Sequence, residues 1–300
     1  MTKKILVIGG YSFLGYNLAK RLINYNYKIY LLCKKKNFRN KLISKKIKYI
    51  YCNILNFKQL KKSLSHHYDY VINFAGNIDH KNKNKTYQAH YQGLKNIIKI
   101  LKKKKIKVFI QTGSSLEYGN NPSPQKETME CLPISYYGRA KYLASKFLLK
   151  NNKYNFKTII LRLYQVYGPH QKVDRLIPMV INSFLKNKSL ECTDGKQKRD
   201  FIYVDDLINL FLKIIKIKKI NSGLYNVGNG KSTSVKNVIE NIYKLIKKGR
   251  PIYGAIKMRK DEIENLYPSI NKVKKIFNWK PHIPLARGLR KTIKFYENKN

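Results

Sequence analysis

Short, continuous runs of apolar residues recur through the first half of the chain. They are rich in β-branched and aromatic residues, and they do not alternate with polar ones. Such runs are typical of parallel strands that are covered on both faces. The pattern predicts strands at Ile5–Gly9, Lys28–Leu32, Lys48–Cys52, Tyr70–Phe74, Val108–Gln111 and Thr158–Leu163.

Amphipathic segments lie between these runs. One apolar stripe consists of Leu14, Leu18, Ala19, Leu22 and Ile23, and another of Ala140, Leu143, Ala144, Phe147 and Leu148. Both have the spacing of a helix with one buried face. Repeated β-α-β units with right-handed crossovers predict an α/β fold, a Rossmann-type doubly wound parallel sheet.

The loop between the first strand and the first helix is rich in glycine. It has the sequence Gly9-Gly10-Tyr11-Ser12-Phe13-Leu14-Gly15. Gly9 permits a tight turn and Gly15 allows close packing of the helix on the strand, while Ser12 replaces the usual middle glycine. Amides at the helix N-terminus can hold a pyrophosphate, so we interpret this loop as a dinucleotide site.

The end of the second strand bears on the choice of dinucleotide. An acid usually stands there in folds that prefer NAD, where it binds the ribose 2′-hydroxyl. Here Cys33 is followed by Lys34, Lys35 and Lys36, with Arg39 nearby. A 2′-phosphate requires cations, so NADP(H) is the preferred prediction, with NAD as the alternative.

The alternation of predicted strands and helices changes after about Gly168, where prolines, loops and shorter helices appear. One more strand is predicted at Leu224–Val227. We expect a dinucleotide-binding domain over residues 1–167, which also receives about 200–229. A smaller, interwoven, substrate-binding cap is expected over 168–199 and 230–300, with a cleft at the carboxyl ends of the strands.

Composition adds a large positive charge. The 300 residues include 63 Lys plus Arg against 16 Asp plus Glu, a formal charge of +47. Lysine occurs in nearly every segment rather than on one face, so we expect solvated surfaces and no physiological nucleic-acid partner. No apolar run approaches the roughly 18 residues of a membrane span. The N-terminus enters a strand at once and the four cysteines form no CxxC pair, which favours a cytoplasmic protein without a metal site.

Tyr137 and Lys141 are four residues apart in the sequence Tyr-Gly-Arg-Ala-Lys. On a helix this spacing places both on one face. A lysine ammonium beside a phenol lowers the pKa of the phenol and prepares it for acid–base work. Ser114 stands 23 residues earlier, at the end of the fifth predicted strand, where a hydroxyl can bind a substrate oxygen.

With these motifs the chain resembles the extended short-chain dehydrogenase/reductase family, which includes nucleotide-sugar epimerases, dehydratases and 4-ketoreductases. The resemblance runs almost end to end. It rests on the glycine loop, Asn73–Gly76, Ser114–Gly119, Tyr137–Lys141, Arg162–Pro169, Lys198–Asp206, Tyr225–Gly230 and Asn278–Pro281.

The resemblance implies Ser114, Tyr137 and Lys141 as the catalytic residues. Tyr137 would exchange a proton with the substrate, Lys141 would also bind the nicotinamide ribose, and Ser114 would polarise the sugar oxygen. The expected cofactor contacts are Gly9, Ser12, Phe13, Leu14, Gly15, Cys33, Lys34, Lys35, Asn53, Ile54, Phe74, Ala75, Gly76, Tyr137 and Lys141. The expected substrate contacts are Ser115, Gln165, Arg175, Arg199 and Arg259, with Arg199 and Arg259 on the diphosphate.

Two departures from the family pattern matter. Gln165 replaces the usual Asn before Val-Tyr-Gly-Pro, which puts one amide contact to the substrate phosphate in doubt. Sugar 4,6-dehydratases carry an Asp-Glu pair directly after the catalytic hydroxyl, but here those positions are Ser115 and Leu116. Leucine cannot exchange a proton, so the sequence disfavours a dehydratase.

We therefore predict an NADPH-dependent reduction of the C4 ketone of a nucleotide-diphosphate 4-keto-6-deoxy or 3,6-dideoxy hexose, in deoxysugar biosynthesis. The stretch from Tyr253 through Arg259, Asp261 and Glu262 is similar to the CDP-abequose and CDP-paratose synthase branch of the family. The alternative is an NAD-dependent 4-epimerase of the UDP-glucose type. A non-catalytic dinucleotide- or RNA-binding relative is a third interpretation, and the intact Ser114, Tyr137 and Lys141 speak against it.

Many family members form homodimers through two helices per subunit. Two apolar stripes would suit such an interface or the core equally well: Leu94/Ile97/Leu101 and Leu143/Phe147.

Overall fold

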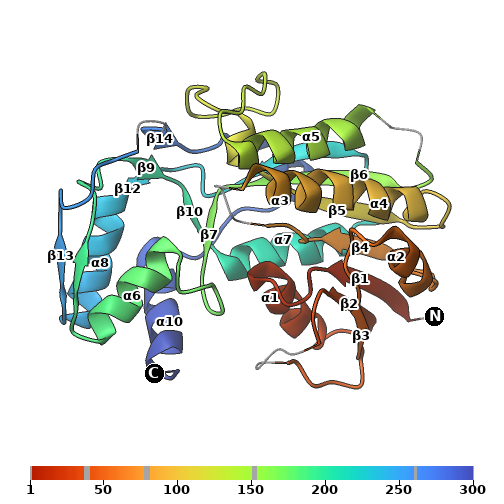
Figure 1. The fold of residues 1–300 in the computed structure, drawn as a ribbon, viewed down its shortest axis with the longest axis horizontal. Coiled ribbons are helices and arrows are strands. Elements are labelled where there is room, and N and C mark those ends of the chain that lie inside the picture. Colours follow the sequence, from red (N-terminus) through yellow and green to blue (C-terminus); the bar gives the residue numbers. More distant parts are fainter. Residues whose placement is uncertain (1, 37–40, 78–81, 151–153, 260–261, 300) are drawn as a thin grey trace. The chain divides into compact units, whose positions relative to one another are not determined.

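The computed structural model describes residues 2–36, 41–77, 82–150, 154–259 and 262–299. Arg39 and Asp261 lie outside these ranges. Within them, seven strands form one sheet in the order β3-β2-β1-β4-β5-β6-β11 (Figure 1). The strands are β1 (Lys3–Ile8), β2 (Tyr27–Cys33), β3 (Ile47–Tyr51), β4 (Tyr70–Asn73), β5 (Val108–Ser114), β6 (Lys157–Leu163) and β11 (Gly223–Val227).

Each of these strands coincides with a predicted apolar run, within three residues at either end. The pairs β1–β2, β1–β4, β2–β3, β4–β5 and β5–β6 are parallel. The chain starts in the middle of the sheet, builds one half outward, and then returns to build the other. This is the doubly wound order, so the predicted Rossmann-type fold is confirmed.

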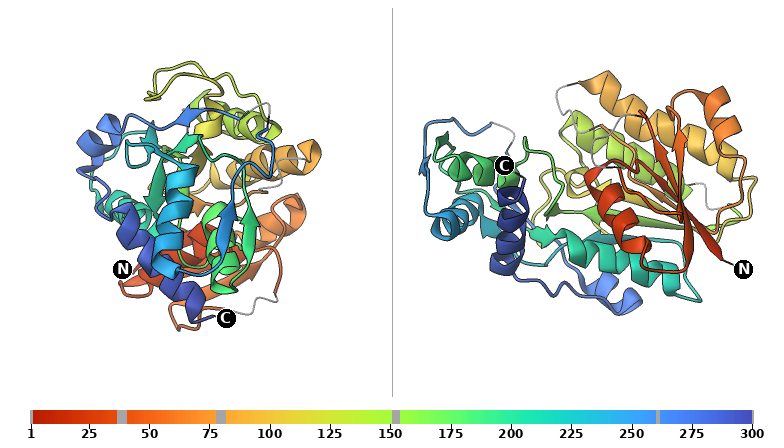
Figure 2. Two further views of the ribbon diagram at one scale, coloured as in Figure 1. Left: turned by 90° about the vertical axis from the view of Figure 1, so that its left-hand side faces the viewer. Right: turned by 90° about the horizontal axis from the view of Figure 1, so that it is seen from below.

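Helices cover both faces of this sheet, as Figure 1 and the right-hand view of Figure 2 show. One face carries α4 and α5, and the other carries α1 and the second half of α7. The helices around the sheet are α1 (Phe13–Leu22), α2 (Phe57–Ser63), α3 (Lys83–Tyr87), α4 (Gly93–Leu101), α5 (Tyr136–Lys150) and α7 (Val204–Lys216). A π turn, η1 (Gln88–Gln92), leads directly into α4, and a 3₁₀ turn, η2 (Ser115–Glu117), follows β5.

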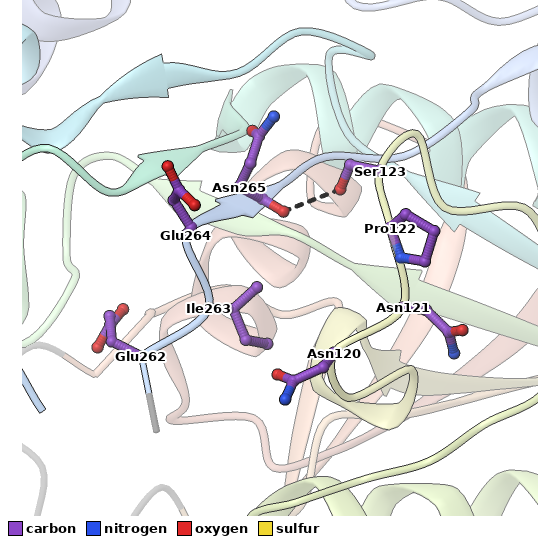
Figure 3. A pocket seen from close by; sticks show the side chains of 8 residues that line it. All are labelled: Asn120, Asn121, Pro122, Ser123, Glu262, Ile263, Glu264 and Asn265. Carbon is purple, nitrogen blue, oxygen red and sulfur yellow. Dashed lines mark hydrogen bonds between the residues drawn. The ribbon is translucent and has the colours of Figure 1, made fainter. Parts of the chain in front are cut away.

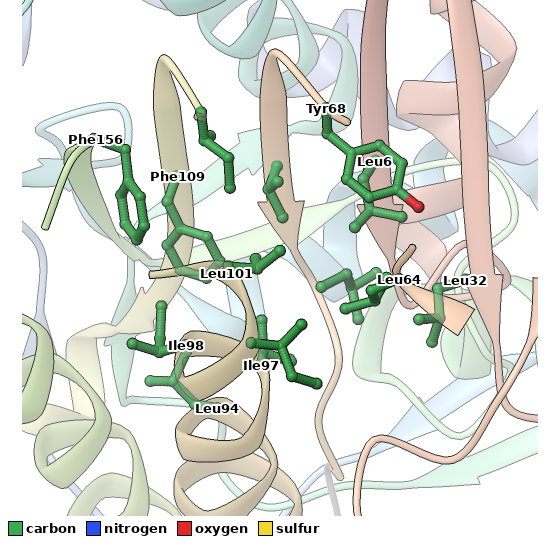
Figure 4. Packing of buried hydrophobic residues seen from close by; sticks show 14 of the residues in the cluster. Leu6, Leu32, Leu64, Tyr68, Leu94, Ile97, Ile98, Leu101, Phe109 and Phe156 are labelled. Carbon is green, nitrogen blue, oxygen red and sulfur yellow. The ribbon is translucent and has the colours of Figure 1, made fainter. Parts of the chain in front are cut away.

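Side chains from the sheet and the helices interlock in a continuous apolar cluster (Figure 4). Leu94, Ile97 and Leu101 on α4 are fully buried in it, together with Leu6 and Phe109 from the sheet. The α4 stripe, for which core and dimer interface were equally open, therefore belongs to the core. Leu143 and Phe147 on α5 are only half-buried.

The described chain divides into two compact units. The first consists of residues 1–119, 129–163 and 210–225, and the second of residues 120–128, 164–209 and 226–300. The chain passes between the units several times, so neither is a continuous stretch. The assignment of a dinucleotide-binding domain and a cap, with the boundaries given above, stays a prediction.

The second unit contains short strands and four helices of the described chain. Its strands are β7 (Gln165–Tyr167), β8 (Ser189–Glu191), β9 (Lys198–Arg199), β10 (Phe201–Tyr203), β12 (Thr233–Ser234), β13 (Arg250–Ile252) and β14 (Asn265–Leu266). They pair as β10-β7, β12-β9-β14 and β13-β8. The helices are α6 (Leu176–Leu185), α8 (Val235–Ile246), α9 (Asn271–Phe277) and α10 (Leu285–Glu297).

The buried carboxylate of Asp206 joins α7 to the segment before α10. Its two oxygens accept the backbone N–H groups of His282, at 3.1 Å, and Ile283, at 2.9 Å. The carbonyl of Asp206 accepts the indole N–H of Trp279 at 3.0 Å. The motif at Asn278–Pro281 thus has a structural role, because Trp279 bonds to the Asp206 backbone directly before the two residues whose N–H groups bind the carboxylate.

Across the described ranges, no helix combines the length and the apolar character that crossing a bilayer demands.

Candidate active site

The glycine loop has the geometry that its sequence predicts. Gly9 has φ +83°, and a Cβ there would lie 2.9 Å from the backbone N of Ala75. A Cβ on Gly15 would lie 2.3 Å from the carbonyl O of Gly9. Ser12 needs no glycine conformation, because it is the N-cap of α1 with φ −67°, and its hydroxyl accepts the N–H of Gly15 at 3.1 Å. The loop therefore folds tightly against the first turn of α1, and its role as a dinucleotide site stays a prediction.

Two further segments meet the same edge of the sheet, after β3 and after β4. Asn53 and Ile54 follow β3, and the carbonyl of Ile54 accepts the side-chain N–H of Asn96 on α4 at 3.0 Å. Phe74, Ala75 and Gly76 follow β4. The structure places these predicted cofactor contacts at the carboxyl ends of β1, β3 and β4, the edge of such sheets where ligands bind.

The Asn73 side chain shapes the loop after β4. Its amide oxygen accepts the Ala75 N–H at 3.0 Å, and its amide nitrogen donates to the Gln111 side chain at 2.8 Å. Both side chains are buried. The hydrogen bond between Asn73 and Gln111 joins the end of β4 to β5. It therefore fixes the loops that follow these two strands relative to each other.

Cys33 ends β2 and is buried, whereas Lys34, Lys35 and Lys36 directly after it are exposed. Burial raises the pKa of the Cys33 thiol to about 12, against smaller opposing effects of the Tyr11 and Gly10 amides. The thiol is therefore neutral near pH 7, and the described residues at this end of β2 present no carboxylate.

The first turn of α5 packs against the segment that follows Ser114. Ser135 caps the helix by accepting the Gly138 N–H at 3.0 Å. A Cβ on Gly138 would lie 2.4 Å from the carbonyl O of Leu116. Only glycine allows this approach, and it brings the turn that carries Tyr137 next to the turn that begins at Ser114.

Lys141 is one turn along α5 from Tyr137 and is 5% exposed. Its Nζ lies 5.7 Å from the centre of the Tyr137 ring and donates to the carbonyl of Thr112 at 2.8 Å. Burial lowers the pKa of Lys141 to about 8, and Glu117 opposes part of this shift. A buried ammonium beside a phenol ring is the arrangement that stabilises a phenolate.

Ser114 is buried and rests on an ion pair that the sequence interpretation missed. Its N–H donates to Glu117 Oε1 at 2.8 Å, and its hydroxyl accepts the Leu116 N–H at 3.2 Å. Glu117 Oε2 accepts Arg162 Nε at 2.9 Å, and the two side chains are 0% and 4% exposed.

Arg162 is held on three sides. Besides Glu117 it donates to Cys131 Sγ at 2.9 Å and lies 4.3 Å from the centre of the Tyr118 ring. Burial lowers the pKa of Arg162, but Glu117, Tyr118 and Cys131 together outweigh that effect and raise it. The arginine therefore stays charged beneath the Ser114 turn.

His90 is a second missed neighbour of the site. It comes from the π turn η1, is 4% exposed, and its ring stands edge-on to Tyr137 with 5.1 Å between ring centres. Its Nε2 lies 2.8 Å from the Asn77 carbonyl O. A Cβ on Gly76 would lie 2.1 Å from the His90 ring. The interlocking of Gly76 with His90 was not readable from sequence, because a π turn changes which side of the helix each residue faces.

The second unit contains the other predicted substrate contacts. Arg199, at the end of β9, is buried, and its guanidinium donates to Glu262 and to the Lys198 carbonyl at 2.7 Å. Arg259 donates to the other oxygen of Glu262 at 2.6 Å and is itself exposed. Burial lowers the pKa of Arg199, with Glu262 opposing it. The structure thus brings Arg199 and Arg259 together on one carboxylate.

Two more predicted contacts lie elsewhere in that unit. Gln165 begins β7 with an exposed side chain, and its N–H donates to the Asp200 carbonyl at 3.0 Å. Arg175 is the half-buried residue directly before α6.

A shallow hollow of about 440 Å³ borders the Glu262 segment (Figure 3). It lies between the stretch Glu262–Asn265 and the loop Asn120–Ser123. A hydrogen bond of 3.0 Å from Ser123 Oγ to the Asn265 carbonyl joins the two segments. Glu262, the shared partner of the two arginines, is at its rim. Among the described residues, no cluster of His, Cys, Asp or Glu has the composition of a metal site.

The doubly wound sheet, the glycine loop at a helix N-terminus, and the pair of half-buried Tyr137 and buried Lys141 next to Ser114 define the class of dinucleotide-binding short-chain oxidoreductase folds. The comparison with family models agrees: the NAD dependent epimerase/dehydratase family matches residues 5–228. The chain belongs to this family.

Two curated relatives are similar over the whole chain. A putative UDP-glucose 4-epimerase of Methanocaldococcus jannaschii is 30% identical over 316 residues, with 99% of each chain covered. A CDP-abequose synthase of Salmonella muenchen is 30% identical over 313 residues, again with 99% of each covered. The two names describe different reactions, so similarity alone does not distinguish reduction from epimerisation.

Solved structures share the fold. The UDP-glucose 4-epimerase of Thermotoga maritima, in complex with UDP-glucose, has a TM-score of 0.92 at 24% identity, with 99% of each chain covered. The UDP-glucuronic acid 4-epimerase of Bacillus cereus, with UDP-glucuronic acid and NAD, has a TM-score of 0.89 at 23% identity, covering 99% of this chain and 100% of that one.

Proposed function

We propose that this protein reduces the C4 ketone of a nucleotide-diphosphate 4-keto-6-deoxy or 3,6-dideoxy hexose with NADPH. The observation that supports reduction over epimerisation is the end of β2. Cys33 stands there as a buried neutral thiol, followed by three exposed lysines, where a carboxylate would favour NAD. A reductase must exchange its cofactor in every turnover, which suits NADP(H).

In this proposal NADPH, when bound, supplies the hydride that goes to C4 of the sugar. Tyr137 donates its phenolic proton to the C4 oxygen, so that the ketone becomes an alcohol. The ammonium of Lys141 stabilises the phenolate that remains, and its 2.8 Å bond to Thr112 holds the ammonium in place. The hydroxyl of Ser114 donates a hydrogen bond to the same sugar oxygen.

The remaining predicted contacts have supporting roles. Ser115 and Gln165 would bind sugar or phosphate oxygens, and Arg175, Arg199 and Arg259 would bind the diphosphate. Glu262 currently accepts from both Arg199 and Arg259 and would compete with an incoming diphosphate for them. The positions of Ser115 and Leu116 do not supply the acid and base pair of a dehydratase, so we expect reduction without elimination of water.

The second candidate is a UDP-sugar 4-epimerase that keeps NAD bound. The similarity to the M. jannaschii protein, equal in identity to that with the CDP-abequose synthase, favours it. The same Tyr137, Lys141 and Ser114 would serve that reaction, in which hydride leaves C4 and returns to the opposite face.

One experiment separates the two. Purified protein is mixed with NADPH and a panel of CDP- and GDP-4-keto-6-deoxy sugars, and in parallel with UDP-glucose alone. We expect the NADPH absorbance to fall with a keto sugar and no change in UDP-glucose. Unchanged absorbance across the panel, with conversion of UDP-glucose to UDP-galactose, would establish the epimerase instead. Tyr137→Phe is the control that removes the proton donor.

A cytoplasmic homodimer completes the proposal. With the α4 stripe in the core, the other predicted stripe, Leu143 and Phe147 on α5, is the one that we propose for the interface, since both side chains are half-buried. Light scattering after size-exclusion chromatography should give twice the chain mass, and Leu143→Lys should reduce it to the monomer mass.

A further inference from the structure

Four side chains gather around the carboxyl ends of β2 and β3, beside the glycine loop. They are Tyr11 from the loop, Cys33 at the end of β2, and Tyr49 and Tyr51 on β3. Cys33 and Tyr51 are register partners in the parallel pair β2–β3, and Tyr49 lies two residues before Tyr51, so these side chains share one face. We call this group the tyrosine cluster.

The cluster touches the loop directly. A Cβ on Gly10 would lie 3.1 Å from Cys33 Sγ, so the strand end and the loop are in contact. The Tyr11 and Tyr49 rings are 5.6 Å apart, and the Tyr49 and Tyr51 rings stack at 6.1 Å. The hydroxyls of Tyr11 and Tyr51 are 3.4 Å apart. Two phenol groups therefore converge where the loop meets the strand ends.

A cation joins the cluster from the segment before β3. Lys41 Nζ lies 4.5 Å from the centre of the Tyr49 ring. The Tyr49 hydroxyl donates to the Leu42 carbonyl at 2.9 Å, which fixes the segment that carries the lysine. The same ammonium is close enough to Cys33 to lower the pKa of that thiol in part. Lys41 is therefore held at the cluster and is not a randomly placed surface charge.

The tyrosine cluster contains hydrogen-bond donors and no carboxylate. Burial raises the pKa of Tyr11, with Tyr51 and Cys33 adding to the shift, so its phenol stays protonated and able to donate. Phenol hydroxyls and an ammonium are donors, whereas a ribose diol in an NAD site donates to a carboxylate. Residues 1–68 contain no Asp or Glu, and 16 Lys or Arg. The tyrosine cluster thus offers several hydrogen-bond donors and no negative charge. The ligand group that suits it is an anion with several acceptor oxygens.

We propose that Tyr11, Tyr51 and Lys41 bind the 2′-phosphate of the NADP(H) adenosine and so determine cofactor choice. This rests on the proposed function for the presence of a dinucleotide, and it assigns residues that motif matching does not identify. Tyr49 acts through Lys41, because its ring faces the ammonium and its hydroxyl anchors the Leu42 backbone.

The test is a binding measurement that needs no substrate. The dissociation constants of NADPH and NADH are measured by calorimetry for the wild type, Tyr11→Phe, Tyr51→Phe and Lys41→Met. A hydrogen bond to a charged group is worth roughly tenfold or more in affinity, so each variant should lose about tenfold for NADPH and less than about twofold for NADH. Tyr27→Phe and Lys28→Met, at the opposite end of β2, are matched controls and should leave both constants unchanged.

Equal affinity of the wild type for NADPH and NADH overturns the inference, and so does an equal loss of both affinities in the three variants. The outcome is separable from that of the proposed reaction. Selective NADPH binding without reduction of any keto sugar would overturn the reaction and leave the phosphate site standing. Reduction of a keto sugar by NADPH and NADH equally well would support the reaction and overturn the phosphate site.

Discussion

Replacing Glu117 tests how much the buried ion pair between Glu117 and Arg162 contributes to the free energy of unfolding. In Glu117→Gln the buried guanidinium of Arg162 loses its counter-charge while remaining 4% exposed. One oxygen of the carboxylate also becomes an N–H₂ group that must face either Arg162 or the Ser114 N–H, and both of these are donors. Breaking a buried ion pair on one side costs about 3–5 kcal/mol. Because domains are stable by only about 5–15 kcal/mol, this is a large part of the total.

The assay is urea unfolding followed by circular dichroism, with a thermal melt beside it. Glu117→Gln should move the transition of the first unit to markedly lower urea. The double variant Glu117→Leu/Arg162→Met removes both charges and leaves mainly the Ser114 N–H unpaired, at about 1–3 kcal/mol, so it should be more stable than the single variant. Lys107→Met is the control: Lys107 lies 3.7 Å from Asp69 and is 59% exposed, and such pairs contribute up to about 1 kcal/mol.

Two results would refute this reasoning. The free energy of unfolding of Glu117→Gln could lie within about 1 kcal/mol of the wild-type value, which would mean that the ion pair between Glu117 and Arg162 is solvated. Alternatively, the double variant could be as unstable as the single one. That would mean that lost packing, and not the unpaired charge, causes the loss of stability.

Four further predictions concern Lys141, Asp206 and Gly15. Lys141 has its pKa lowered to about 8, so it is charged below that pH and neutral above it; turnover should decline as pH rises through about 8, and a flat profile to pH 10 would contradict this. The same shift should make stability increase between about pH 8 and 10.5, because the unfolded chain then binds more protons, and Lys141→Met should abolish that increase. Asp206→Ala removes the acceptor of two backbone N–H groups and should cost about 1–3 kcal/mol in urea unfolding; an unchanged midpoint would show that water replaces it. Gly15→Ala places a Cβ 2.3 Å from the Gly9 carbonyl and should abolish dinucleotide binding in calorimetry, and retained affinity would mean that the loop adjusts.

The apolar runs were sufficient to predict the sheet, since strands buried on both faces have a distinctive continuous pattern. The doubly wound, parallel character of the sheet was predicted from the repeated β-α-β units, whereas the strand order came from the structure. The sequence also placed Tyr137 and Lys141 on one helix, because their spacing is local.

Long-range polar contacts were beyond that reasoning. Glu117 and Arg162 are 45 residues apart and meet only because β5 and β6 are neighbours. His90 reaches Tyr137 through a π turn, which an α-helical periodicity does not anticipate. Asp206 and the backbone of His282 are 76 residues apart, so the purpose of the Asn278–Pro281 motif became visible only in the fold.

The central claim is that hydride passes from NADPH to the C4 carbon of a nucleotide-linked keto sugar. Its most direct test is to incubate the protein with NADPH that carries deuterium at the transferable position and with a CDP-4-keto-6-deoxy sugar, and to analyse the product by mass spectrometry. We predict one deuterium at C4 of the sugar and an equal amount of NADP formed. Conversion of a nucleotide sugar with no deuterium in the product and no net NADP would contradict the claim.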